Sequence, residues 1–146
     1  MAKPVVITLT VEASTLFNLV NPTQAQIDAC CSLSDDNGGS GSPIENFTST
    51  VFIDKNVKWK GETPDRGFSI AIDSIAYESN GADVNFFDVS IIPGSEGRSG
   101  NANANVKKDD SLKGKMDVYT LNFKVYDSGS NFKSFPIDPK LAINPE

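Results

Sequence analysis

The stretch DVYTLNFKVY, residues 117–126, decides the fold class of this chain. Along it, large apolar side chains alternate with polar ones. The apolar positions are Tyr119, Leu121, Phe123 and Val125, and the polar positions between them are Thr120, Asn122 and Lys124. A period of two is typical of a β-strand that turns one face to a hydrophobic core and the other to water. The stretch therefore predicts a half-buried strand.

The same alternation recurs elsewhere in the chain. Segment 4–11 shows it, and in segment 68–77 it changes phase near Asp73 and Ser74, which predicts a β-bulge. Tight turns are expected at Asn80-Gly81 and at Asp127-Ser128-Gly129-Ser130, because such residues favour hairpins. Further strands are expected over residues 49–54, 56–60, 84–92, 101–106, 131–136 and 140–144. The residues expected in the core are Ile7, Leu9, Trp59, Ile70, Ile72, Leu121 and Phe123.

Helix signals are sparse. Asn21-Pro22-Thr23 suits the start of one short helix that ends near Cys31. The whole pattern predicts an all-β fold, an antiparallel β-sandwich of about eight short strands with at most one short helix. Immunoglobulin-like and jelly-roll versions both fit. We expect one domain over residues 1–146, with a flexible loop rich in glycine, serine and aspartate at residues 34–43.

Composition excludes several classes of site. The 146 residues include no histidine, which removes Ser-His-Asp and Cys-His catalysis and histidine-ligated zinc. The net charge is −6, a balance that disfavours nucleic acid as a partner. No nucleotide-binding glycine loop is present, so no cofactor is expected.

The chain shows no targeting or membrane signal. No apolar run approaches the roughly 18 residues of a membrane span, and the first residues do not resemble a signal peptide. We therefore expect a cytoplasmic protein with no membrane partner. Cys30 and Cys31 are adjacent and cannot form an ordinary bridge with each other, so we expect two free thiols, one buried and one half-exposed. A metal or disulfide shared between subunits is the alternative.

Three groups of residues are candidate binding sites. Asp35, Asp36 and Asn37 form either a polar turn or a loose calcium site, although their spacing fails the EF-hand pattern and no metal is assigned. Trp59 is either a core residue or a platform for stacking a ligand. Asn101 and Asn103 lie in the run NANAN, which predicts an exposed edge strand that can accept a partner strand or a sugar.

One resemblance concerns the end of the chain. The pattern YTLNF at 119–123, then FPIDPK at 135–140 and INPE at 143–146, resembles the ending of the small bacterial DP-EP family. That family has no known function. The resemblance covers about the last 30 residues, implies a β-sandwich from a bacterium and supplies no catalytic residue.

The sequence thus favours a soluble, acidic, non-catalytic protein that works by binding or assembly. The expected partner is a second copy, another protein or a glycan. A carbohydrate- or calcium-binding module is the alternative. A small glycoside hydrolase is the third possibility, with candidate carboxylates at Asp73, Glu78, Asp83 and Asp88.

Overall fold

The computed structural model describes residues 3–37, 40–41, 47–77, 85–95, 97, 100–129 and 131–144. In these residues the chain forms two α-helices, one 3-10 helix (Asp110–Leu112) and eleven strands. The helices are α1 (Ala13–Phe17) and α2 (Gln24–Ala29). The strands are β1 (Val5–Val11), β2 (Cys31–Asp35), β3 (Ser40–Gly41), β4 (Thr48–Val51), β5 (Asn56–Glu62), β6 (Ser69–Tyr77), β7 (Ile91–Pro93), β8 (Ala102–Asn105), β9 (Met116–Tyr126), β10 (Phe132–Ile137) and β11 (Lys140–Ile143).

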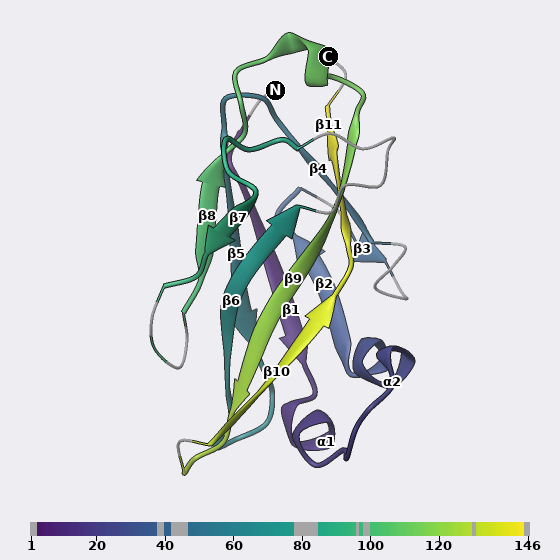
Figure 1. Cartoon of the computed structure of the whole chain (residues 1–146), viewed down its shortest axis with the longest axis vertical. Helices are drawn as coiled ribbons and strands as arrows, with labels where there is room; N and C mark the ends of the chain where they lie inside the picture. Colours follow the sequence, from purple (N-terminus) through teal and green to yellow (C-terminus); the bar gives the residue numbers. More distant parts are fainter. Residues whose placement is uncertain are drawn as a thin grey trace.

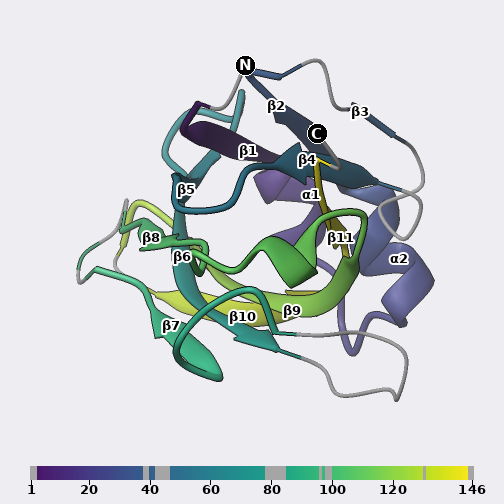
Figure 2. The same ribbon diagram turned by 90° about the horizontal axis from the view of Figure 1, so that it is seen from above.

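Two sheets face one another. The first sheet has the order β3-β2-β1-β5-β8, and the second has the order β4-β11-β9-β6-β7, with β10 also paired to β9. Figure 2 shows β1 and β5 in one layer and β6, β9 and β10 in the other. The two helices lie together at one end of the molecule, whereas β1 begins and β11 ends at the other end (Figure 1).

The core lies between the sheets and is built by alternation. β9 has the burial pattern of a strand with one face inside, and so does β1. All seven residues expected in the core are buried, with exposed fractions of 2% or less. The expectation of an all-β chain and its predicted core are confirmed.

The predicted bulge is also present. The pairing of β6 with β9 shifts register between Ile72 and Ser74, so Asp73 is the extra residue. Ile70 and Ile72 face the core before the bulge, and Ile75 faces it afterwards. The change of phase in the sequence was therefore the signature of a bulge.

Two predictions about the sheets are wrong, and so is the predicted length of one strand. The sheets are mixed rather than antiparallel, because β1 runs parallel to β5 and β11 runs parallel to β4. The strand number is also larger than expected, because β2 and β3 fall partly or wholly inside the loop predicted at residues 34–43. Segment 84–92 was overestimated, since residues 85–90 are not a strand and only β7 forms at its end. The turn predicted at Asn80-Gly81 lies outside the described residues.

The chain has two short helices where at most one was expected. α2 starts later than predicted because Thr23, not Asn21, is its N-cap. The Thr23 hydroxyl accepts a hydrogen bond from the Gln26 N–H at 3.2 Å, and the Gln26 side chain accepts one from the Thr23 N–H at 2.8 Å. This reciprocal pair is a capping box, which satisfies two backbone donors at the helix start. No helix in the described part of the chain is long and apolar enough to cross a membrane.

The core prediction can be tested by truncation. Phe123 is fully buried and its ring packs against that of Phe135, with centroids 5.8 Å apart. Phe123→Ala should therefore lower the free energy of unfolding by about 3–5 kcal/mol, measured by urea denaturation. Val20 is 85% exposed, so Val20→Ala should change it by less than about 0.5 kcal/mol. Equal effects of the two substitutions would contradict this assignment of the core.

Candidate functional site

The predicted acidic turn joins strands of both sheets. The Asp36 carboxylate accepts a hydrogen bond from the Val6 N–H at 3.0 Å. The Asp35 carboxylate accepts one from the Asn37 N–H at 2.8 Å and another from the Ser49 hydroxyl. The Asn37 amide donates to the Thr50 carbonyl on β4 at 3.1 Å. These bonds connect β2 with β1 in its own sheet and with β4 in the other sheet, which is a structural role. No cluster of three acidic or cysteine side chains suited to a metal occurs among the described residues.

Trp59 lies in the core rather than at a surface. Its side chain is fully buried, and its indole N–H donates a hydrogen bond to the Tyr119 hydroxyl at 3.0 Å. The Phe87 ring packs edge-on against it, with centroids 5.8 Å apart. An indole with no exposed surface offers no platform to a ligand, so the core alternative for Trp59 is the one that the structure favours.

Asn101 and Asn103 occupy different surroundings. Asn101 precedes β8 and exchanges hydrogen bonds with Ser95: its N–H donates to the Ser95 hydroxyl at 2.9 Å, and its carbonyl accepts from the Ser95 N–H at 2.8 Å. Asn103 lies on β8, the outermost strand of the first sheet, and its side chain is exposed. The edge-strand prediction is confirmed, and the structure does not bring these two residues into one site with Asp35 or Trp59.

The two thiols match the expectation of free cysteines. Cys30 is buried and Cys31 is half-buried, and neither is bonded to another sulfur. Burial raises the pKa of Cys31 well above its ordinary value, and the neighbouring Cys30, Asp28 and Glu12 raise it further. Burial and Glu12 also raise the pKa of Cys30. Both thiols are therefore protonated at neutral pH, a state that is poorly nucleophilic.

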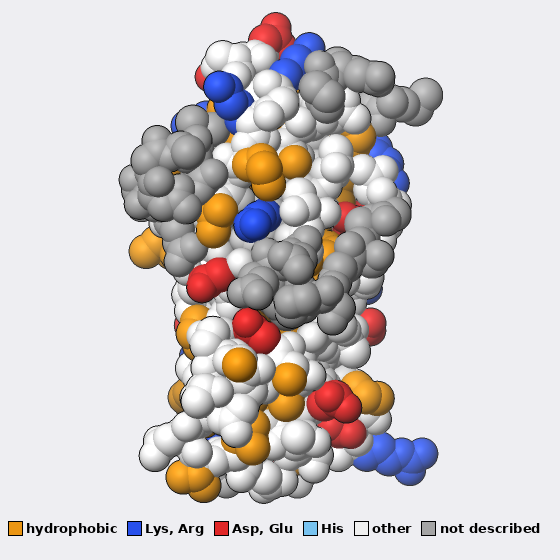
Figure 3. Space-filling view, turned by 90° about the vertical axis from the view of Figure 1, so that its right-hand side faces the viewer, with side chains coloured by type: hydrophobic (Ala, Val, Ile, Leu, Met, Phe, Trp, Pro, Cys, Tyr) orange, Lys and Arg blue, Asp and Glu red, His pale blue; other side chains and the backbone are white. Residues whose placement is uncertain are grey.

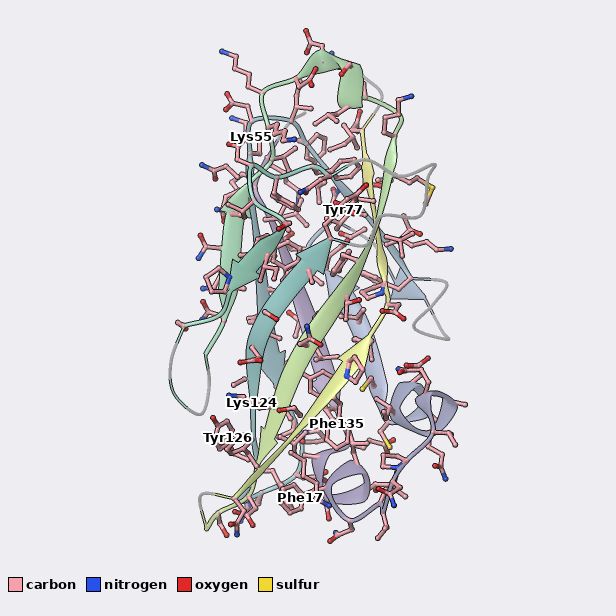
Figure 4. The ribbon with its side chains drawn as sticks, in the orientation of Figure 1. Phe17, Lys55, Tyr77, Lys124, Tyr126 and Phe135 are labelled. Carbon is pink, nitrogen blue, oxygen red and sulfur yellow. The ribbon has the colours of Figure 1, made fainter. Side chains whose placement is uncertain are left out.

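A hollow that sequence reasoning did not find lies on the outer face of the second sheet. It has a volume of about 270 Å³, and its lining includes Asp73 of β6, Lys124 and Tyr126 of β9, and Gly94 and Ser95 of the segment that follows β7. Lys124 and Tyr126 lie near one end of the sheet, and Tyr77 lies near the other end of β6 (Figure 4).

The bulge makes this hollow possible. The extra residue Asp73 accepts a backbone hydrogen bond from the Gly94 N–H at 2.8 Å, and the Ile72 N–H donates to the Gly100 carbonyl at 2.8 Å. A Cβ atom at position 94 would lie 1.8 Å from the Ile72 carbonyl oxygen, so only glycine permits this approach. The segment after β7 is thereby held against the bulge and forms one wall of the hollow.

Two aromatic rings lie on the β9 side of the hollow, and one of them, Tyr126, lines it. Tyr126 and Phe132 are neighbours across β9 and β10, with ring centroids 5.4 Å apart, and Phe132 is 51% exposed. The Lys124 ammonium lies 4.9 Å from the centroid of the Phe132 ring and 3.4 Å from a carboxylate oxygen of Asp73. The site thus places a cation, an anion and an aromatic pair side by side.

This combination suits binding of a polar molecule with an apolar face. Lys124 supplies hydrogen-bond donors, Asp73 supplies acceptors, and an aromatic ring can pack on weakly polarised C–H groups. Asp73 is the only carboxylate among the described residues that line the hollow, whereas glycoside hydrolysis needs two. Of the other hydrolase candidates, Glu78 and Asp83 lie outside the described residues, and Asp88 is exposed in the segment between β6 and β7.

The comparisons with known proteins add no family. No family model matches the chain, and no curated protein matches it.

The role of Gly94 can be tested directly. Gly94→Ala forces the Ile72 carbonyl to move, so it should lower the free energy of unfolding by about 1–3 kcal/mol. Gly129→Ala is the matched control, because its nearest contact would be an ordinary 3.5 Å. That control should stay within about 0.5 kcal/mol of the wild type in the same urea titration. A Gly94→Ala protein as stable as the control would show that the backbones do not approach so closely.

The buried phenol of Tyr119 predicts alkaline sensitivity. Burial raises the pKa of Tyr119 well above its ordinary value of 10.0, so the unfolded chain releases this proton first and stability falls as pH rises above about 10. Between pH 9 and pH 11 the wild type should lose about 1.4 kcal/mol more stability than Tyr119→Phe. Urea denaturation at both pH values measures this difference. Parallel loss in both proteins would contradict the burial of an un-ionised phenol.

Proposed function

We propose that the chain is a non-catalytic binding protein whose hollow at Asp73, Lys124 and Tyr126 takes a saccharide. The observation that carries this proposal is the ion pair of Asp73 and Lys124 beside an aromatic pair, in which Tyr126 is half-buried and Phe132 is exposed. A sugar presents hydroxyls on its rim and C–H groups on its ring faces. Its hydroxyls can accept from Lys124 and donate to Asp73 while a ring face packs on Tyr126.

The size of the site supports this class of ligand. A volume of about 270 Å³ is close to the lower end of ordinary small-molecule sites, which suits one or two sugar rings rather than a large cofactor. We also propose that the two sheets form a β-sandwich and that the C-terminal pattern relates the chain to the DP-EP family. We propose a cytoplasmic location as well, because free thiols such as Cys30 and Cys31 stay reduced there.

Assembly through a broad apolar surface has less support. On the face seen in Figure 3, hydrophobic side chains form small separate groups among polar atoms. The exposed large apolar residues of the described part of the chain are few, and only Val89 and Ile91 are close together in the sequence. They are Val20, Val89, Ile91, Met116 and Phe132. A stable self-association normally needs a larger continuous apolar area.

An array of neutral and acidic oligosaccharides tests the proposal. Wild-type protein should bind at least one of them, and titration calorimetry with that sugar should show about tenfold weaker binding by Tyr126→Ala, because a ring contact contributes up to about 1.4 kcal/mol. Tyr126→Phe keeps the ring and should bind within about threefold of the wild type.

A charge control completes this test. Lys124→Met should weaken binding of the same sugar, whereas Lys115→Met, which removes an exposed lysine of the turn before β9, should not. Failure of the wild type to bind any saccharide would refute the proposal. So would binding that survives Tyr126→Ala and Lys124→Met unchanged.

A further inference from the structure

The outer face of the first sheet carries a second set of polar side chains, which we name the amide–lysine face. It consists of Asn56, Lys58 and Lys60 on β5 and Asn103 and Asn105 on β8. Asn56 pairs with Asn105 and Lys58 pairs with Asn103 across the two strands. These side chains point outward, because the residues that alternate with them on each strand are buried or half-buried and face the core.

Hydrogen bonds fix the orientation of the three asparagine side-chain amides on this face. The Asn56 amide nitrogen donates to the Oδ1 atoms of both Asn103 and Asn105, at 3.3 Å and 3.1 Å. Since both Oδ1 atoms accept from Asn56, the Nδ2 groups of Asn103 and Asn105 are the parts left to meet a ligand. Each of these two asparagines can therefore still donate through its Nδ2 group, whereas its Oδ1 atom already accepts one hydrogen bond.

The lysines add positive charge beside these donors. In the part of the chain that the structure describes, no carboxylate lies within ion-pair distance of Lys58 or Lys60. The acids on or beside this outer face are Glu62, at the end of β5, Asp36, whose carboxylate already accepts the Val6 N–H, and Glu12, which lines a small hollow with Thr10 and Ser32. The five residues of the amide–lysine face itself carry two positive charges and no negative one, although the chain has a net charge of −6.

The spacing of the donors indicates the shape of the anion. Side chains two residues apart on one strand are about 7 Å apart, and neighbouring strands are about 5 Å apart. The donors thus form a two-strand array rather than a single pocket. The adjoining positions of the same face carry short side chains. They are Thr8 and Thr10 on β1 and Ser32 and Ser34 on β2.

We propose that the amide–lysine face binds an acidic polysaccharide through its carboxylate or sulfate groups. Ammonium and amide donors make charge-assisted hydrogen bonds to such groups, and an extended polymer can meet several donors at once along the strands. Among the described residues of this face there is no aromatic side chain on which a nucleic-acid base can stack. The site lies on the sheet opposite the hollow and does not depend on saccharide binding there.

The probes are polygalacturonate, dextran sulfate and uncharged dextran, with single-stranded DNA as the competing polyanion. Wild-type protein should bind at least one acidic polysaccharide, and its affinity should fall steeply as salt rises from 20 to 200 mM, about tenfold or more. Uncharged dextran should not bind. Equal or tighter binding of single-stranded DNA would overturn the proposal, as would the absence of binding to both acidic polymers.

Two double variants locate the site. Lys58→Met with Lys60→Met should weaken binding at least tenfold. Lys113→Met with Lys115→Met removes the same charge from exposed residues outside this face and should weaken binding less than threefold. Equal losses would overturn the proposal, because they would show attraction by overall charge alone.

A single substitution tests the amides without changing charge. Asn103→Ala removes one donor from an exposed position, so it should keep the wild-type melting temperature and bind the acidic polymer several-fold more weakly. If the lysine variants do not fold, this variant still tests the proposal, because unchanged binding by Asn103→Ala would contradict it. Tyr126→Ala should bind the acidic polymer as the wild type does. A failure of this proposal is therefore distinguishable from a failure of the proposal that the hollow binds a saccharide.

Discussion

The hydrogen bond between Trp59 and Tyr119 is the interaction on which the arrangement of the two sheets depends. It joins β5, inside the first sheet, to β9, inside the second, and both side chains are fully or almost fully buried. An indole N–H or a phenol hydroxyl left unpaired in an apolar core costs about 1–3 kcal/mol. Each group satisfies the other only when the two strands face each other at one offset. The bond therefore restricts how the sheets slide, which nonspecific apolar packing does not.

The alternation of β9 was enough to predict its class, its buried face and its role in the core. Side-chain period is a local property, so it survives in the sequence whatever the partners are. The parallel partners of β1 and β11 were not predictable in this way, because pairing direction depends on contacts between segments far apart in the chain. β2 was missed because its five residues bury only Leu33 fully, and α1 was missed because five residues give too little helical periodicity.

The hollow shows how a local prediction can be right and its consequence still hidden. The phase change at Asp73 predicted a bulge, yet nothing nearby in the sequence indicated that Gly94 and Gly100 would pack against it. Tyr126 and Phe132 were readable as strand residues. Their stacking follows only from the β9–β10 register, which places them opposite each other. The site is therefore a product of tertiary pairing, and its chemistry could not be read from any single motif.

Where the acids lie matters more than how many there are. Several carboxylates accept hydrogen bonds from backbone N–H groups and so stabilise the fold. Asp36 accepts from the Val6 N–H, Asp65 from the Ser14 N–H, and Asp127 from the N–H groups of Gly129 and Asn131. These acids sit in turns and loops, fixed by the donors that they satisfy. Lys58 and Lys60, by contrast, stand on a regular strand. Because exposed charges farther apart than about 8–10 Å are largely screened in physiological salt, the field above a strand is set by its neighbours rather than by the net charge. An acidic protein can therefore offer lysines that have no carboxylate within ion-pair distance among the described residues, and only the fold reveals where they lie.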